Sequence, residues 1–150
     1  MLREKITEAT KGAMKSQEKT KLSTLRLMSA AIQNADIEAR TAGKQPLSDD
    51  ELLGVFQKLV KQRQESVELY EKGGRAELAK QEKDEIEVIK GFLPQQMSEA
   101  EVKAAIAGII KETGAASVKD MGKVMAALKE RYAGKMDFGK ASGAVKDSLK

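Results

Sequence analysis

The sequence contains no cysteine and no histidine. Without these two residue types the chain can form no disulfide, thiolate nucleophile, imidazole base or zinc site of the Cys/His type. Their absence excludes most of the hydrolytic and redox chemistry that proteins carry out with their own side chains. We therefore predict no catalytic residue, no metal site and no cofactor site.

Long apolar runs are also absent. The longest, Ala104 to Ile110, is far shorter than the roughly 18 apolar residues that a membrane-spanning helix needs. The first residues, Met1 to Ile6, include three charged side chains and lack the apolar segment of an export signal. We therefore expect a cytoplasmic protein.

Charge is unevenly distributed along the chain. The 27 basic and 23 acidic residues give a net charge of +4, and residues 119–150 alone carry eight basic and four acidic residues, also +4. Residues 1–44 are likewise basic at +4, whereas residues 45–118 are acidic at −4. Such asymmetry bears on the choice of partners rather than on the fold.

Helical periodicity runs through the whole sequence. Apolar residues recur at spacings of three and four, and no segment shows sustained alternation with a period of two. Capping boxes at Ser48–Glu51 and Ser98–Glu101 mark two helix starts. Glycines mark helix ends, because they lower helix propensity and accept left-handed geometry. The first predicted helix is 2–15, and the second runs from about Leu22 and ends by Gly43. The third runs from the Ser48 box to Gly73-Gly74, and the fourth from about Arg75 to the segment before Pro94. The fifth runs from the Ser98 box to Gly114, the sixth follows Asp120 or Ser117 and ends at Gly134, and the seventh begins at Asp137 and includes Leu149.

This pattern predicts an all-α fold, in which an N-terminal four-helix part is followed by a C-terminal three-helix bundle. Pro94 disfavours helical geometry at the residue before it. We therefore place an N-terminal helical domain at residues 1–94 and a C-terminal domain at residues 95–150. In the second helix we expect Leu27 and Ala31 to widen the buried stripe.

Arg63 and Glu82 both fall on the apolar stripes of their helices. Either the two side chains form a half-buried ion pair between helices three and four, or both are exposed. In the C-terminal part, Asp120 or Ser117 is expected to cap helix six, Gly134 to end it, and Asp137 to cap helix seven.

The turn from Gly134 to Lys140 resembles a phosphate-binding loop, because Gly134 is followed after four residues by Gly139 and Lys140. Two features argue against a nucleotide site. The pattern ends in Ala141 where a hydroxyl residue would hold magnesium, and a helix rather than a strand precedes it. We still expect the amides at the start of helix seven, beside Lys135 and Lys140, to attract a phosphate.

The C-terminal cations are the candidate nucleic-acid contacts. Tyr132 and Phe138 are the aromatic residues of this region, too few for a platform on which unpaired bases stack. A folded RNA, recognised through phosphates and shape, suits the region better, and a lysine-rich solvated surface is the alternative. The candidate RNA-binding residues are Lys119, Lys123, Lys129, Arg131, Lys135, Lys140 and Lys146.

Six segments follow one another over nearly the whole chain: Leu25–Ile32, Lys58–Ser66, Gly74–Ala79, Phe92–Gln96, Asp120–Met125 and Gly134-Lys135. Together they resemble the GatB/YqeY family, in particular its free-standing YqeY-like members. The resemblance implies an all-helical protein whose C-terminal part is similar to the tail domain of GatB, the tRNA-contacting component of the aspartyl/glutamyl-tRNA amidotransferase. The chain lacks the kinase-like cradle of GatB and the serine-rich signature of its glutaminase partner.

Three functional hypotheses follow. The first is a non-catalytic accessory protein that binds tRNA or a tRNA-processing enzyme through the basic C-terminal domain. The second is a protein–protein adaptor that docks on an amidotransferase or another partner. The third, a carbon–nitrogen ligase activity, would need partner subunits, because no pair of nucleophile and base is visible in this chain.

Overall fold

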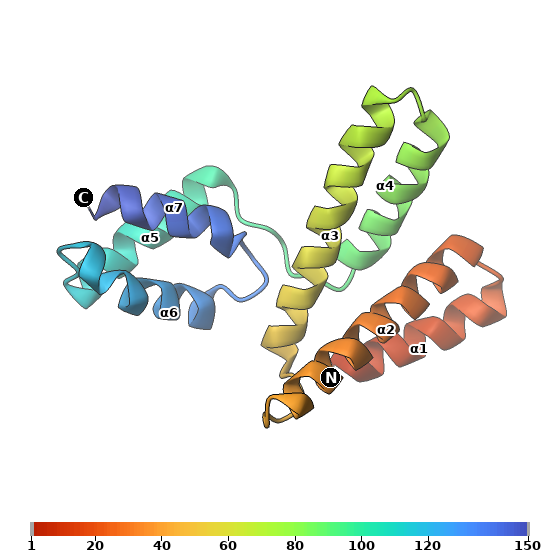
Figure 1. Ribbon diagram of the computed structural model, residues 1–150, viewed down its shortest axis with the longest axis horizontal. Helices are drawn as coiled ribbons and strands as arrows, with labels where there is room; N and C mark the ends of the chain where they lie inside the picture. The colour runs from red at the N-terminus through yellow and green to blue at the C-terminus, as the bar shows by residue number, and fades with distance from the viewer. Residues whose placement is uncertain (1, 150) are drawn as a thin grey trace. The chain divides into compact units, whose positions relative to one another are not determined.

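A computed structural model describes residues 2–149, and these form seven α-helices and one 3-10 helix with no β-strand (Figure 1). The predicted all-α fold is therefore confirmed. The elements are α1 (Leu2–Ser16), α2 (Lys19–Thr41), α3 (Asp49–Lys72), α4 (Ala76–Lys90), α5 (Glu99–Thr113), η1 (Val118–Asp120), α6 (Met121–Arg131) and α7 (Phe138–Ser148).

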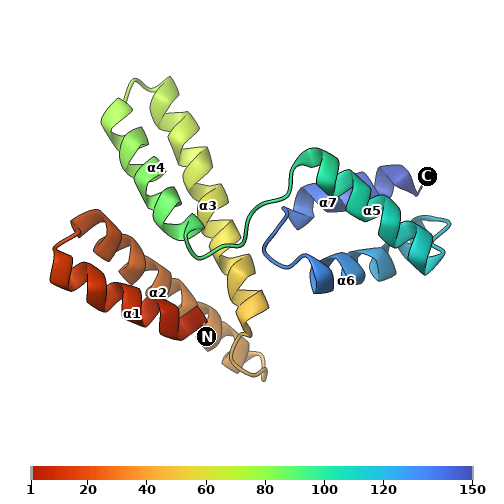
Figure 2. The same ribbon diagram turned by 180° about the vertical axis from the view of Figure 1, so that it is seen from behind.

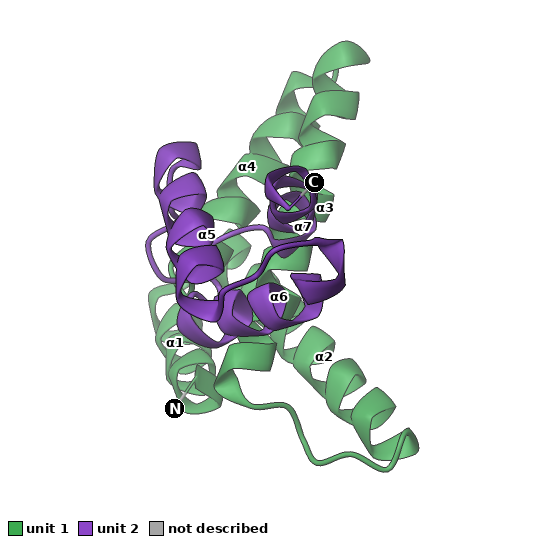
Figure 3. Cartoon of the chain, turned by 90° about the vertical axis from the view of Figure 1, so that its left-hand side faces the viewer, with its two compact units in different colours: residues 1–93 green, residues 94–150 purple. Residues whose placement is uncertain are grey.

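The chain divides into two compact units, residues 1–93 (unit 1) and residues 94–150 (unit 2), which Figure 3 colours separately. Unit 1 holds α1 to α4, and unit 2 holds α5 to α7 with η1. In the part of the chain that the structure describes, no helix combines the length and apolarity needed to cross a bilayer.

Unit 1 consists of two helical hairpins, and the views from front and back both show α1 beside α2 and α3 beside α4 (Figures 1 and 2). The inner faces meet in one core, where Leu25, Met28, Leu52, Phe56 and Ile89 are fully buried. These residues come from α2, α3 and α4. Apolar burial at helical spacing is therefore what joins the two hairpins.

Both predicted capping boxes are confirmed. At the start of α3 the Ser48 side chain accepts a hydrogen bond from the Glu51 amide at 3.3 Å, and the Glu51 carboxylate accepts one from the Ser48 amide at 3.1 Å. Ser98 and Glu101 make the same reciprocal pair at the start of α5. Each box satisfies amides that no helical carbonyl can reach.

An ionic clamp that sequence reasoning missed ties α1 to α2. Arg3 donates to both carboxylate oxygens of Asp36, at 2.6 and 3.0 Å, and to the Leu47 carbonyl at 2.8 Å. The Leu47 amide donates to Asp36 at 3.0 Å. The hydrogen bond from Arg3 is the main cause that lowers the pKa of Asp36, followed by the one from Leu47. The clamp also fixes the loop that leads into α3.

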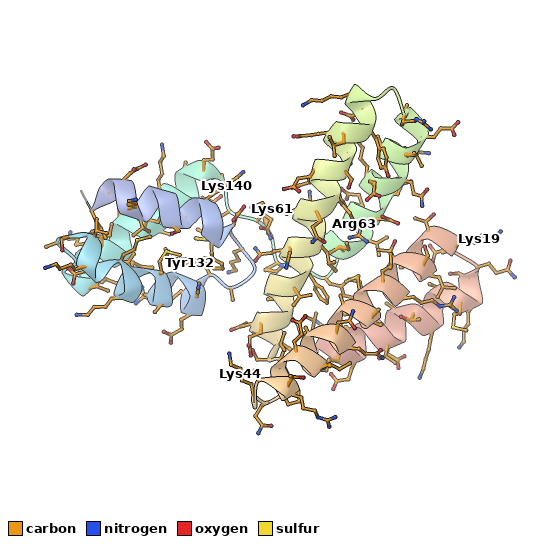
Figure 4. All side chains as sticks on the ribbon, viewed as in Figure 1. Lys19, Lys44, Lys61, Arg63, Tyr132 and Lys140 are labelled. Carbon is orange, nitrogen blue, oxygen red and sulfur yellow. The ribbon has the colours of Figure 1, made fainter. Side chains whose placement is uncertain are left out.

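Arg63 lies between α3 and α4 (Figure 4). Its contacts show that the first alternative, an ion pair between the two helices, is correct. The predicted pair with Glu82 is present, with Nε 4.0 Å from the carboxylate oxygen. Glu85, one turn further along α4, is closer at 3.1 Å and is buried. One guanidinium therefore serves two carboxylates. Burial raises the pKa of Glu82, as does the neighbouring Glu85 carboxylate, while Arg63 opposes both effects.

Unit 2 has its own core, in which Ile106, Ile109, Val124, Leu128 and Val145 are buried. Its first residues are bound to the turn between α6 and α7. The Met97 amide donates to the Lys135 carbonyl at 2.9 Å, and Gln96 Nε2 donates to the Gly134 carbonyl at 2.6 Å. These two bonds hold together segments that lie almost forty residues apart.

Three local predictions need correction. Leu27 does not widen the buried stripe of α2, because 48% of its surface is exposed. Gly134 does have the predicted left-handed backbone, with φ of 75°, but α6 has already ended at Arg131 with Tyr132 as its C-cap. Asp120 occupies the N-cap position of α6 without a capping side-chain bond. Its carboxylate instead accepts a hydrogen bond from the Ala116 amide at 3.0 Å.

The Arg63 cluster yields a prediction about stability. Replacing Arg63 by methionine leaves two carboxylates with little solvent and no cation, which should cost about 3 to 5 kcal/mol at pH 7. The raised pKa of Glu82 favours the folded protein at low pH and disfavours it as pH rises, so this cost should shrink as the pH falls and Glu82 takes up a proton. Urea unfolding monitored by Tyr70 fluorescence in a Tyr132→Phe background reports on unit 1.

The matched control is Lys83→Met. Lys83 also pairs across α3 and α4, with Glu71 at 2.8 Å, but both side chains are more than half exposed. Loss of this pair should cost less than about 1 kcal/mol. Equal losses for Arg63→Met and Lys83→Met would contradict the role assigned to the buried cluster.

Candidate nucleic-acid interface

All seven candidate cations have exposed side chains in unit 2. Lys119 lies on η1, Lys135 lies in the turn after α6, and the others lie on α6 and α7. The α6 residues are Lys123, Lys129 and Arg131, and the α7 residues are Lys140 and Lys146. Figure 4 labels Lys140 near the start of α7 and Tyr132 just after α6. The elements therefore present every predicted residue to solvent.

The helical phase shows that these cations do not share one face. At roughly 100° per residue, Lys129 lies about 120° around α6 from Lys123. Arg131 lies roughly 80° from Lys123 on the opposite side. On α7, Lys140 and Lys146 are again separated by about 120°. A ligand that contacts all seven would have to wrap around unit 2, so a single compact RNA site would use only part of the set.

Arg131 differs from the six candidate lysines because it forms an ion pair. Arg131 contacts Glu112 of α5 at 2.7 Å, and both side chains are about half exposed. Within residues 2–149, none of the six lysines has a carboxylate oxygen within 4.0 Å. Lys123 acts only at longer range on Asp120, whose pKa is lowered chiefly by the Ala116 amide. The lysine ammonium groups are therefore available to phosphates.

The start of α7 is not the phosphate-attracting site predicted from the sequence. Asp137 is the predicted N-cap, and its Oδ1 accepts hydrogen bonds from the Gly139 amide at 2.9 Å and the Lys140 amide at 3.3 Å. The amides expected to meet a phosphate are thus occupied by a carboxylate of the same chain. The expectation was wrong because one residue serves as cap and competing anion. Attraction for phosphates must come from side chains.

A groove of about 470 Å³ lies beside the same turn, where the first residues of unit 2 fold back. Tyr132 and Lys135 line it on one side, and Gln95, Met97 and Glu101 on the other. Sequence reasoning missed this groove, because it depends on the long-range bonds of Gln96 and Met97. Tyr132 lines the groove, and both Tyr132 and Phe138 are partly buried and pack against the core of unit 2.

The described residues contain no group of three or more His, Cys, Asp or Glu side chains that could hold a metal ion. The acidic residues of α4 that the structure describes therefore form no such group. Of these, Glu82 and Glu85 turn toward Arg63.

The chain is similar to one protein family and to several proteins of fungi. The model of a family described as "Yqey-like protein" matches residues 3–149. A protein of Lachancea thermotolerans named "Altered inheritance of mitochondria protein 41, mitochondrial" is 35% identical over 104 residues, covering 68% of this chain and 54% of its own length. Proteins with that name from Eremothecium gossypii and Pyrenophora tritici-repentis are 35% identical over 88 residues and 33% identical over 128 residues.

The coverage of these relatives is partial. The matches cover 59% of this chain and 46% of the Eremothecium protein, and 81% of this chain and 67% of the Pyrenophora protein. The chain thus spans about half the length of the first two relatives.

The predicted cytoplasmic location is contradicted by these relatives. Those from Lachancea, Eremothecium, Vanderwaltozyma and Pyrenophora are all named as mitochondrial proteins. The prediction rested on the lack of an address in the first residues, and that lack does not define a compartment. We therefore withdraw the cytoplasmic location.

The cap of α7 can be tested by substitution. Asp137→Ala should lower the stability of unit 2 by about 1 kcal/mol, because two amides lose their acceptor. Asp137→Asn retains a capping oxygen and should cost less. Urea unfolding monitored by Tyr132 fluorescence in a Tyr70→Phe background measures both. A wild-type midpoint for Asp137→Ala would show that the cap contributes nothing.

Proposed function

This chain belongs to the YqeY-like family, and we propose that it is a non-catalytic accessory protein that binds tRNA through the lysines of unit 2. The observation that carries the proposal is the set of six exposed lysines without a carboxylate partner among the described residues. They are Lys119, Lys123, Lys129, Lys135, Lys140 and Lys146. Unpaired ammonium groups can neutralise phosphates without first breaking an intramolecular bond.

Net charge supports the same proposal. Unit 2 contains ten basic and seven acidic residues and therefore carries +3, whereas unit 1, with 17 and 16, carries only +1. Each phosphate that a lysine neutralises releases a condensed counterion, which makes binding favourable at low salt. Unit 2, which holds the candidate cations, therefore carries a larger net positive charge than unit 1 although it is shorter.

The scarcity of exposed aromatic side chains in the described part of unit 2 favours a folded RNA over a single strand. Tyr132 is the only half-exposed aromatic side chain at the groove among the residues described, which is too little for successive stacked bases. The lysines that lie on one side of unit 2 can instead contact the phosphates of a folded RNA, which is recognised by its shape. The resemblance of the C-terminal part to the GatB tail domain supports tRNA as that RNA.

An accessory role agrees with the chemistry of the chain. It has neither cysteine nor histidine, and no nucleophile–base pair was found in the sequence. A carbon–nitrogen ligase activity would thus depend on partner subunits. The protein-adaptor alternative is favoured by a separate observation in unit 1, the exposure of Leu27 and Ile37 on α2.

Salt titration tests the tRNA proposal. The logarithm of the tRNA association constant should fall linearly with the logarithm of the salt concentration. Lys123→Ala and Lys135→Ala should each weaken binding and reduce this slope by about 0.7 to 0.9 for every phosphate that is no longer neutralised. The weakening should be similar for different tRNA sequences, since phosphates carry no sequence information.

Lys103→Ala and Lys111→Ala on α5 are the matched controls. Both lysines are exposed in unit 2 but lie outside the candidate set, so their removal should leave the slope nearly unchanged. The proposal fails if the wild-type chain does not bind tRNA at about 50 mM salt, where phosphate contacts are strong. It also fails if the two pairs of variants lose affinity equally, because binding would then reflect net charge alone.

A further inference from the structure

Helix α2 carries a second apolar stripe, on the side that faces away from the core. Leu25, Met28 and Ile32 are buried inside unit 1, whereas Leu27 is 48% exposed and Ile37 is 60% exposed. At roughly 100° per residue these two exposed residues lie within about 80° of each other, opposite the buried stripe. Packing within unit 1 therefore does not account for them.

The exposed side of α2 has the spacing of a helix-docking seam. Its residues follow one another at alternating intervals of four and three, which keeps them on one line along the helix. All are exposed, and we call them the outer face of α2: Ser23, Leu27, Ala30, Asn34, Ile37 and Thr41. The face extends about 27 Å at 1.5 Å per residue. Asn34 lies between the apolar Ala30 and Ile37 on this face, and an asparagine at such a position can fix the register of a partner helix.

The rim of the outer face is positively charged. Arg26, Arg40 and Lys44 are exposed beside it, against one exposed acid, Glu38. Asp36 adds little negative charge, since Arg3 binds both of its carboxylate oxygens. Ile37, Arg40 and Lys44 also line a groove of about 510 Å³ between the end of α2 and the following loop. Figure 4 shows Lys44 at the end of α2 that lies away from Lys19.

We propose that the outer face of α2 docks an acidic amphipathic helix of a partner protein. Such a helix places leucine-like side chains against Leu27, Ala30 and Ile37 and carboxylates against the basic rim. A second copy of this chain would bring one basic rim against another, which like-charge repulsion opposes. RNA would match the rim but would gain nothing from the exposed Leu27 and Ile37. The acidic helix alone matches both features.

A synthetic probe tests this surface on the full chain. The probe is a fluorescein-labelled peptide of about three heptads, with leucine at the a and d positions and glutamate at e and g. Repulsion between glutamates keeps the peptide itself from pairing. Fluorescence anisotropy should show saturable binding that weakens as salt rises. Peptides with lysine in place of glutamate, or with scrambled order, should bind at least about tenfold more weakly.

Variants of the chain locate the binding site. Leu27→Glu combined with Ile37→Glu should weaken binding roughly tenfold or more, since two apolar side chains are replaced by groups of the same charge as the probe. Arg40→Ala with Lys44→Ala should weaken it several-fold and flatten its salt dependence. The matched control is Leu69→Glu, because Leu69 on α3 is 69% exposed in the same unit but lies outside the face. The affinity of this control should stay within about twofold of wild type.

Four results would overturn the proposal. They are no saturable binding, equal binding of the scrambled peptide, an equal loss of affinity for Leu69→Glu, and concentration-dependent dimerisation of the chain that Ile37→Glu abolishes. The last would assign the face to a second copy. All substitutions are at exposed positions of unit 1, so urea unfolding monitored by Tyr70 fluorescence in a Tyr132→Phe background checks that unit 1 of each variant is folded.

Discussion

Each unit of this chain has to bury its own apolar core, and most of the structure follows from that constraint. Small domains bury a smaller fraction of their surface than large ones, so a unit of fewer than about 60 residues has little stability to spare. Unit 2 is of this size, and it supplements its core with a capping box at Ser98, an N-cap at Asp137 and the bonds from Gln96 and Met97. In unit 1 the Arg3 clamp fixes the ends of its helices in a similar way.

The sequence predicted what local rules determine. Helix starts at Ser48 and Ser98 and the cap at Asp137 depend on residues within four positions of each other, and all three were confirmed. The Arg63–Glu82 pair was one of two stated alternatives, because helical phase places both residues on inner faces. Helical phase could not single out Glu85, since Glu82 and Glu85 lie one turn apart on the same side of α4.

What the sequence could not supply depends on tertiary geometry. The Arg3–Asp36 clamp joins residues 33 positions apart, and no periodicity connects them. Leu27 was wrongly predicted to be buried, because the periodicity of apolar residues does not show how many of those beside the central stripe are covered by other helices. Its assignment as solvent-facing required the packing of α2 against α1 and α4. The start of α7 was misjudged because the same aspartate that caps a helix also fills the site where an anion would bind.

The two proposals involve different physical forces. Unit 2 offers ammonium groups on a surface where Val118 is the one exposed large apolar residue among those described, which suits the phosphates of an RNA. The outer face of α2 combines apolar side chains with a basic rim, which suits a protein helix. Salt therefore weakens both interactions, but only the second depends on apolar contact. Positive charge alone could not distinguish these two partners, and the exposed Leu27 and Ile37 make the difference.

The bonds from Gln96 and Met97 to the turn at Gly134 and Lys135 have a topological consequence. They close residues 96–135 into a loop, so two hydrogen bonds link the segment before α5 to the turn after α6 in addition to the core contacts. The residues before the Ser98 capping box resemble a linker in the sequence, yet they form one end of this loop. A fragment that begins at Ser98 would lose both bonds, and the turn that carries Lys135 would then depend on core contacts such as those of the buried Met136.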